Sequence, residues 1–213
     1  MFSHFWKKSS KRNENALDKD APDATSVSTS RSSGSLRSSR SKKSRQKNKS
    51  KNQQDASEIK TPNEQVVERF FAKLNAHAST EEFLSFFTSG DAPIKFDDSK
   101  VMNATIMATE MQKVYAGFGD LRLNYGSVKE VKPDVVLLDD LYATGTHTGP
   151  YQFANFPPVE ATHKSIATDP ERCWFHMKDG KFKGEEVIAL GNLTGPPGMY
   201  IAVGGKMDIP PGE

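Results

Sequence analysis

Most of the large apolar side chains of this chain lie after residue 60, and this division decides which residues can build a hydrophobic core. No aromatic residue lies between Trp6 and Phe70, and residues 9–60 show neither the apolar periodicity of a helix nor the alternation of a strand. Such a segment cannot bury enough apolar surface to offset the entropy lost on ordering. We therefore expect a disordered tail over residues 1–60, followed by one folded domain.

The net charge changes sign at the same place. Residues 1–60 hold 15 Lys/Arg and 6 Asp/Glu, a net charge of +9, whereas residues 61–213 hold 14 Lys/Arg and 21 Asp/Glu, a net charge of −7. The Ser/Arg/Lys tract over residues 30–51 is typical of a nuclear localisation signal or a non-specific nucleic-acid-binding segment. With the N-terminal aromatic residues it would also dock on an anionic membrane surface, and its interleaved Ser and Arg suit a phosphorylation switch. A solvated linker is the plain alternative.

The domain after the tail is large enough for one core without covalent staples. About 150 residues bury roughly two-thirds of the surface that their unfolded chain exposes, and Cys173 is the only cysteine, so no internal disulfide forms. No apolar run approaches the roughly 20 residues that cross a bilayer, and the first residues lack the apolar stretch of a signal peptide. We expect a soluble intracellular protein, cytoplasmic or nuclear. Organelle targeting stays an alternative, because the tail is rich in Ser and Arg.

Three helices are predicted at the start of the domain. Residues 61–64, Thr-Pro-Asn-Glu, combine a capping Thr, a Pro at the first helical position and a Glu three residues after the cap, so a helix is expected over residues 62–77. Residues 79–82, Ser-Thr-Glu-Glu, repeat the cap and begin a short second helix. Apolar residues recur at helical spacing over about 103–116, which predicts the third.

The rest of the domain predicts a sheet. Residues 178–181, Lys-Asp-Gly-Lys, indicate a tight hairpin turn, whereas the Gly-Pro-Pro-Gly of residues 195–198 and the Pro-Pro-Gly of residues 210–212 are interpreted as turns. Helices first and long strands afterwards favour an α+β fold, with helices covering one face of an antiparallel sheet. The expected strands cover residues 94–97, 121–131, 135–148, 160–168, 172–178 and 182–190.

Two motifs resemble the SnoaL-like polyketide cyclase family. Residues 145–151, Gly-Thr-His-Thr-Gly-Pro-Tyr, resemble the segment that ends a long strand in that family, and residues 157–158 resemble its Pro-Pro step. Residues 175–182 resemble its hairpin, and the three leading helices match its order. The resemblance covers about residues 62–195 and implies a nuclear transport factor 2-like fold, in which a cone-shaped, curved antiparallel sheet is covered by three N-terminal helices. We therefore expect a domain over residues 61–195 and a C-terminal extension over 196–213.

The resemblance implies a pocket for a small hydrophobic molecule, but the catalytic group of the cyclases does not carry over. In that family an Asp near the end of the last strand acts as acid/base, within a Glu-x-Trp-x-x-x-Asp pattern. Here Glu185 or Glu186 matches the Glu, Val187 replaces the Trp, and Leu190 or Gly191 replaces the Asp. We therefore expect a ligand-binding domain without standard cyclase chemistry. An acid/base isomerase, cyclase or dehydratase acting on a small carbonyl compound is one alternative, and a dimeric scaffold positioned by its basic tail is another.

Three residues are the candidate catalytic groups for the enzymatic alternative. His147 lies where the long strand ends and has the chemistry of a general base. His176 aligns near a pocket His of the cyclases, although strand alternation places it with Trp174, on the face opposite the apolar residues of its strand. Asp140 interrupts an apolar strand, so it would have a raised pKa if it pointed inward; a bulge that leaves it and Asp139 in solvent is the alternative. For both His residues the alternative is a structural or surface role.

No cofactor or metal is expected. The chain has no phosphate-binding Gly loop, nucleophile elbow or dinucleotide fingerprint, and its five His residues include no close pair with metal-ligand spacing. The expected partners are a small hydrophobic ligand in the pocket, an anionic membrane or nucleic acid for the tail, and a second copy of the chain in a homodimer. Trp174 is the expected interface anchor.

Overall fold

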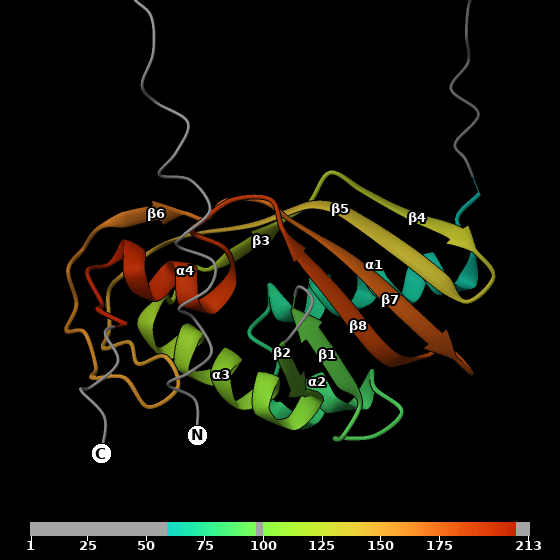
Figure 1. The fold of residues 1–213 in the computed structure, drawn as a ribbon, viewed down its shortest axis with the longest axis horizontal. Helices are drawn as coiled ribbons and strands as arrows, with labels where there is room; N and C mark the ends of the chain where they lie inside the picture. Colours follow the sequence, from blue (N-terminus) through green and yellow to red (C-terminus); the bar gives the residue numbers. More distant parts are fainter. Residues whose placement is uncertain (1–58, 97–99, 208–213) are drawn as a thin grey trace, which may run out of the picture. The chain divides into compact units, whose positions relative to one another are not determined.

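A computed structural model describes residues 59–96 and 100–207 (Figure 1). The predicted tail, apart from its last two residues, lies outside the described residues, as do Asp97 of the first predicted strand and the turn at residues 210–212. None of the helices in the described part is long and apolar enough to cross a membrane.

The three predicted N-terminal helices are confirmed, and local caps explain where they begin. In α1 (Pro62–Leu74) the Glu64 amide donates to Thr61 Oγ1 at 3.2 Å, while the Thr61 amide donates to Glu64 Oε2 at 2.9 Å. The same reciprocal cap begins α2 (Thr80–Ser85) at Ser79, and Asn103 caps α3 (Ala104–Gly117). These bonds satisfy amides that have no partner within the helix.

Helix α1 ends three residues earlier than predicted, for a tertiary reason. The side chain of Asn75 exchanges two hydrogen bonds with the backbone of Leu123, at 2.7 and 3.0 Å. His77 then adopts a left-handed conformation with φ of 58°, which ends the helical path. The partner strand is distant in sequence, so the helical periodicity up to residue 77 contained no sign of this stop.

The strands form one curved sheet in the order β2-β1-β8-β7-β5-β3, with β4 and β6 also paired to β5. Its pairs are antiparallel except for β1 with β8, which is parallel. The long connection between these two strands, from β2 to β7, allows this direction. The strands described are β1 (Pro93–Phe96), β2 (Lys100–Asn103), β3 (Arg122–Asn124), β4 (Ser127–Lys132), β5 (Val135–Thr146), β6 (Ser165–Ala167), β7 (Glu171–Lys178) and β8 (Lys181–Ala189).

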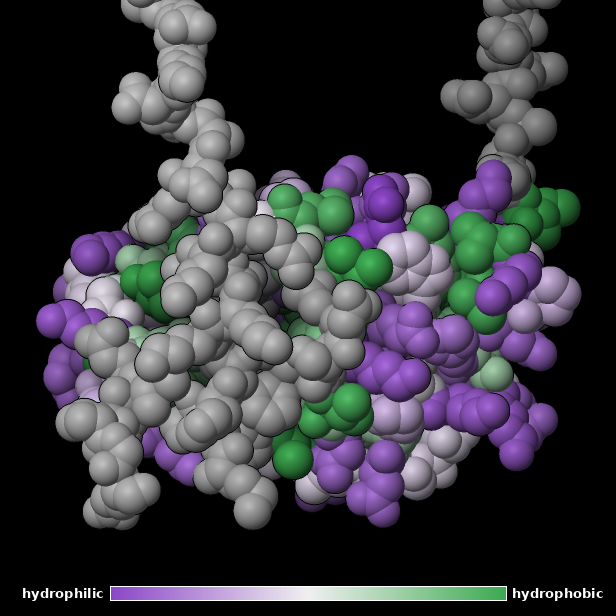
Figure 2. Space-filling view, in the orientation of Figure 1, coloured by the Kyte–Doolittle hydropathy of each residue, from purple (hydrophilic) through white to green (hydrophobic). Residues whose placement is uncertain are grey.

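The sheet has an inner face, which is covered by helices, and an outer face. In β7 the side chains of Cys173, Phe175 and Met177 are buried on the inner face, while Trp174 and His176 lie on the outer face. This is the alternation that the sequence predicted. In Figure 1, β5, β7 and β8 run side by side and α1 crosses behind them; Figure 2 shows mainly hydrophilic residues over the front of β7 and β8.

Phe70 of α1 is at the centre of the core. Its ring lies 5.0–6.3 Å, centroid to centroid, from six other aromatic rings in edge-on geometry. Edge-on pairs at such distances stabilise a core beyond the area they bury. The six partners come from α1, from α2 and the residues after it, and from the β7–β8 hairpin: Phe71, Phe83, Phe86, Phe87, Phe175 and Phe182.

The predicted turn at residues 195–198 is wrong, because these residues form the first turn of a fourth helix, α4 (Gly195–Ala202). Two prolines suit a first helical turn, where the missing amides would have no helical partner. Met199 and Tyr200 are buried in the core, and the Tyr200 hydroxyl donates to the Pro157 carbonyl at 2.6 Å. Burial of these side chains explains why a segment that looks like loop punctuation is helical.

Candidate functional site

Two adjoining cavities lie between the inner face of the sheet and helices α3 and α4. The outer cavity has a volume of about 300 Å³ and the inner cavity about 90 Å³. Of the described residues that line both cavities, one is polar, Glu171, and the others are apolar side chains or glycine. The residues common to both are Phe96, Met107, Glu171, Gly195 and Pro196.

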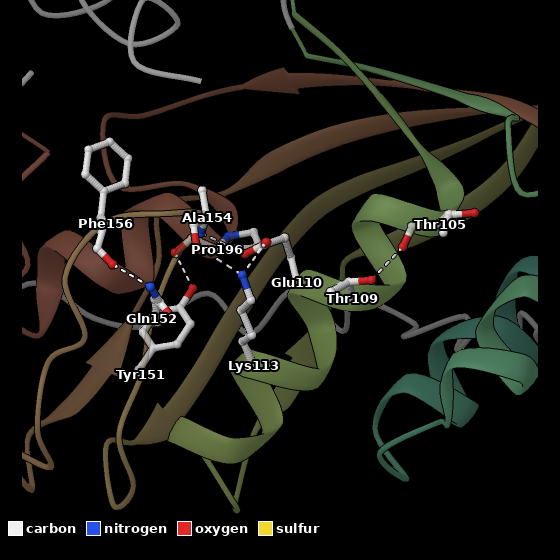
Figure 3. A network of polar contacts seen from close by, with 9 residues as sticks. All are labelled: Thr105, Thr109, Glu110, Lys113, Tyr151, Gln152, Ala154, Phe156 and Pro196. Carbon is white, nitrogen blue, oxygen red and sulfur yellow. Dashed lines mark hydrogen bonds and ion pairs between the residues drawn. The ribbon is translucent and has the colours of Figure 1, made fainter. Parts of the chain in front are cut away.

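The wall of the outer cavity is held together by a buried carboxylate on α3. Glu110, which is 6% exposed, accepts hydrogen bonds from the amide of Ala154 at 3.0 Å and from Lys113 Nζ at 2.8 Å. Lys113 Nζ also donates to the Ala154 carbonyl at 3.1 Å. Figure 3 shows how these contacts join the segment after Tyr151 to α3. The charge of Glu110 is therefore used within the wall.

The same segment is joined to α4. The Tyr151 hydroxyl donates to the Pro196 carbonyl at 2.8 Å (Figure 3), and Gly117 gives the Tyr151 ring room on α3. A Cβ at Gly117 would lie 2.8 Å from Tyr151 Cβ, closer than real contacts allow. Helices α3 and α4 thus approach each other around this ring, and the outer cavity lies between them and the segment 153–156.

A carboxyl group lines the inner cavity. Glu185 of β8 pairs with Phe175 of β7, and its side chain turns to the inner face with Cys173 beside it. Burial raises the pKa of Glu185 to about 7, although a hydrogen bond with the Cys173 thiol acts in the opposite direction. Burial also raises the pKa of Cys173 well above its usual value. The half-buried Glu185 therefore exchanges a proton near neutral pH, where an ordinary Glu is fully ionised.

A second carboxyl group lies where the two cavities meet. Glu171 begins β7, pairs with Ala189 and lines both cavities. A Cβ at Gly195 would lie 3.0 Å from Glu171 Oε1, so this carboxyl is packed against the start of α4. Glu185 is four residues from Ala189 along β8, a separation of about 13 Å. The two carboxyls are therefore at different depths and do not act as one pair.

Nothing in the described part of the chain forms a metal site, since no three His, Cys, Asp or Glu side chains come together there. The described residues that line the two cavities also include no cation. The site can therefore hold an apolar molecule, accept hydrogen bonds through Glu171, accept or donate them through Glu185, and exchange a proton at Glu185.

His147 lies outside both cavities. Its side chain is fully buried, Nδ1 is 3.0 Å from Thr162 Oγ1 and accepts from the Thr162 amide at 3.2 Å, and the ring lies beside Phe118. Burial lowers the pKa of His147. Its geometry is that of a ring bonded to a neighbouring loop, and a catalytic role stays a prediction.

Asp140 and His176 also lie outside both cavities. Asp140 is exposed in a bulge of β5, with φ of 54°, and the adjacent Asp139 pairs with Arg172 at 2.7 Å. His176 is on the outer face, with Nε2 3.3 Å from Glu186 Oε1. The three predicted catalytic residues therefore lie apart from the two cavities and do not form one site in the structure. Their catalytic roles stay predictions. The homodimer also stays a prediction.

Sequence reasoning missed the two inner-face carboxyls for different reasons. Glu171 shares the strand parity of Cys173, but the predicted strand began at residue 172 and so left it out. Glu185 does not share the parity of Phe182, which is buried on the same face, because the β7–β8 register shifts between His176 and Met177. The resemblance left the choice between Glu185 and Glu186 open, and only the register decides it.

No family model and no curated protein matches the chain. Solved structures do. AclR from Streptomyces galilaeus, suggested to be a hydroxylase, is 19% identical, with 70% of this chain and 85% of that chain covered and a TM-score of 0.53. A suggested SnoaL-like polyketide cyclase from Jannaschia sp. CCS1 is 20% identical, covering 63% and 89%, with a TM-score of 0.48. TerC, crystallised with polyporic acid, is 17% identical, covering 61% and 92%, with a TM-score of 0.42.

At these identities the likeness concerns the fold alone. The likeness to AclR agrees with the curved sheet and the covering helices described above. The chain therefore has the α+β fold, with helices covering a curved sheet, that the sequence predicted.

Proposed function

We propose that the domain binds a small, largely apolar organic molecule in the joined outer and inner cavities. The observation that supports this is the make-up of the walls: aromatic, Met and Pro side chains surround a few polar groups, as in ligand sites generally. The outer volume of about 300 Å³ is at the lower end of the range for ligand pockets, roughly 300 to 1,000 Å³. A compact one- or two-ring molecule suits it better than a long lipid chain.

A blocking substitution tests this function directly. Met107 of α3 lines both cavities, so Met107→Trp would fill their junction. We expect the full chain to bind 2-ethylnaphthalene and 2-acetylnaphthalene, two compact apolar probes, and Met107→Trp to weaken both at least tenfold. Titration calorimetry measures this. Ala116→Trp is the matched control, because Ala116 is exposed on the same helix and lines neither cavity.

The proposal fails if neither probe binds the wild-type chain. It also fails if Met107→Trp and Ala116→Trp bind the probes as tightly as the wild type does, since binding would then be outside the cavities. Circular dichroism of both variants shows whether a loss of binding reflects a loss of folding.

Acid/base catalysis on a small carbonyl compound is a second candidate, and Glu185 is the observation that favours it. A general acid or base works best when its pKa is near the working pH, and the pKa of Glu185 is raised to about 7. In its ionised form Glu185 would remove a proton from the carbon next to a bound carbonyl, leaving an enolate, and the resulting acid would return a proton to that carbon.

Deuterium exchange tests this candidate. In D₂O we expect the wild-type chain to speed exchange of the methyl protons of 2-acetylnaphthalene, as followed by NMR, and Glu185→Gln to abolish the effect. Asp140→Asn and His176→Gln are controls that should keep it, because neither residue lines the two cavities. If the wild-type chain binds the ketone without speeding exchange, the catalytic candidate is wrong and only the binding function remains.

A further inference from the structure

The charges around the cavities limit which ligands can enter. Among the residues that the structure describes, the lining includes Glu110, Glu171 and Glu185 but no Lys, Arg or His. The ammonium of Lys113 is paired with Glu110 in the wall. An anionic ligand would therefore bring a second negative charge into an apolar space whose described walls offer no positive partner, and burying an unpaired charge is strongly unfavourable.

The groups that face Glu185 show which hydrogen bond its carboxyl can make with a ligand. Residues of α1, α3, α4 and β1 that line the inner cavity are apolar or glycine and proline: Phe70, Met107, Met111, Met199, Phe96 and Gly195 are examples. The titratable groups that share the cavity are Cys173 beside the carboxyl, Glu171 at the opposite end, and Tyr142. The Cys173 thiol occupies an acceptor site on the carboxyl. A protonated carboxyl then keeps one O–H donor for the cavity.

We propose that the ligand is a neutral molecule whose carbonyl-type oxygen accepts a hydrogen bond from the protonated Glu185, and that carboxylic acids of the same size are rejected. The inference rests on the proposed binding function and adds the chemical class of the ligand. It also makes Glu185 a specificity-determining residue. An ionised Glu185 has no proton to donate and repels the carbonyl oxygen, so binding of such a ligand weakens as the pH rises.

Three probes of nearly equal size separate these effects: 2-acetylnaphthalene offers a carbonyl acceptor, 2-ethylnaphthalene offers none, and 2-naphthoate is an anion. Titration calorimetry with the full chain between pH 5.5 and pH 8.5 compares them. Below pH 7 we expect the ketone to bind at least tenfold more tightly than either other probe. Above pH 7 its affinity should fall by up to roughly tenfold per pH unit, while that of 2-ethylnaphthalene changes little.

Two variants assign the effect to Glu185. Glu185→Gln keeps a donor but cannot titrate, so it should retain ketone binding and lose the pH dependence. Glu185→Leu has no donor and should bind the ketone and the hydrocarbon alike. Glu186→Gln is the matched control, because Glu186 is the next residue on β8 and is exposed on the outer face. It should behave as the wild type.

The outcomes separate this inference from the binding function. If the ketone and the hydrocarbon bind with equal affinity at every pH, or if 2-naphthoate binds more tightly than the ketone, the role of Glu185 is overturned and the binding function stands. A pH dependence that persists in Glu185→Gln also overturns it. If none of the probes binds the wild-type chain, the binding function fails and the inference fails with it.

Discussion

Cys173 and Glu185 lie beside each other on the inner face of the sheet, on adjacent strands β7 and β8, with their side chains joined by a hydrogen bond. The thiol is fully buried and its pKa is well above the usual value, so it remains protonated and acts as a donor. No cation lines the cavity among the described residues, so this weak donor opposes the effect of burial only in part. Burial therefore prevails and raises the pKa of the carboxyl to about 7.

We predict that Glu185→Gln stabilises the folded chain at high pH. The pKa of Glu185 is raised from 4.5 to about 7 on folding, so the folded state binds more protons than the unfolded state between these values. The free energy of unfolding must then fall as the pH rises from about 4.5 to 7. The variant lacks this loss. The difference in the free energy of unfolding, variant minus wild type, should therefore be about 2 kcal/mol larger at pH 8 than at pH 5.

Urea unfolding at pH 5 and pH 8 measures this difference, with Glu186→Gln as the control on the outer face. A wild type and a Glu185→Gln variant with parallel pH profiles would show that the carboxyl titrates normally. That result would contradict the environment described for Glu185.

We predict the opposite pH dependence for His147. Burial lowers its pKa below the ordinary value of 6.5 for His, so the unfolded state binds the proton more readily. The stability that the neutral ring contributes is present above pH 6.5 and is lost as the pH falls through the folded pKa. His147→Phe should lose this acid sensitivity. At pH 8 it should also be less stable by about 1–2 kcal/mol, because the Thr162 amide loses its acceptor.

Thermal unfolding between pH 5 and pH 8 checks the His147 prediction. His163→Asn is the control, since His163 is exposed and its left-handed backbone suits Asn. Equal acid sensitivity in wild type and His147→Phe would mean that the ring is protonated without cost in the folded state.

The hydrogen bonds of Glu110 predict that two substitutions at this residue destabilise the fold to different extents. Glu110→Ala removes the acceptor for the Ala154 amide as well as the partner of Lys113, and should cost about 2–3 kcal/mol. Glu110→Gln keeps an oxygen for the amide and should cost about 1 kcal/mol. Both should speed dissociation of bound 2-acetylnaphthalene, because the segment 153–156 is held less firmly to α3. Urea unfolding and stopped-flow fluorescence measure the two effects; equal costs for the two variants would contradict the assignment.

Truncation tests whether α4 belongs to the folding unit. A chain that ends at residue 193 lacks Met199, Tyr200 and Val203, all buried in the core, and should lose cooperative unfolding. A chain that ends at residue 207 keeps α4 and should unfold as the full chain does. If the chain ending at 193 melts at the same temperature as the full chain, the domain ends before α4, near the boundary of 195 expected from the resemblance.

Helix starts could be predicted from the sequence because their causes are local. Thr61 with Glu64 and Ser79 with Glu82 each satisfy the free amides of their own first turn, so a four-residue motif is sufficient evidence. The inner face of β7 was predictable for the same reason, since alternation within one strand needs no partner. The helix end at Leu74 was not, because it depends on the contact of Asn75 with Leu123.

By itself, then, the sequence determined the three N-terminal helices, the hairpin at Asp179 and the buried face of β7, all of which follow from interactions between near neighbours in the chain. It did not predict β2, and the single strand expected over residues 121–131 is divided into β3 and β4. The tertiary structure alone decided that Glu185 rather than Glu186 faces the cavity, because a register shift between paired strands reverses the side-chain alternation along β8. It also decided that Gly195 begins a helix, since burial of Met199 and Tyr200 against distant elements stabilises α4.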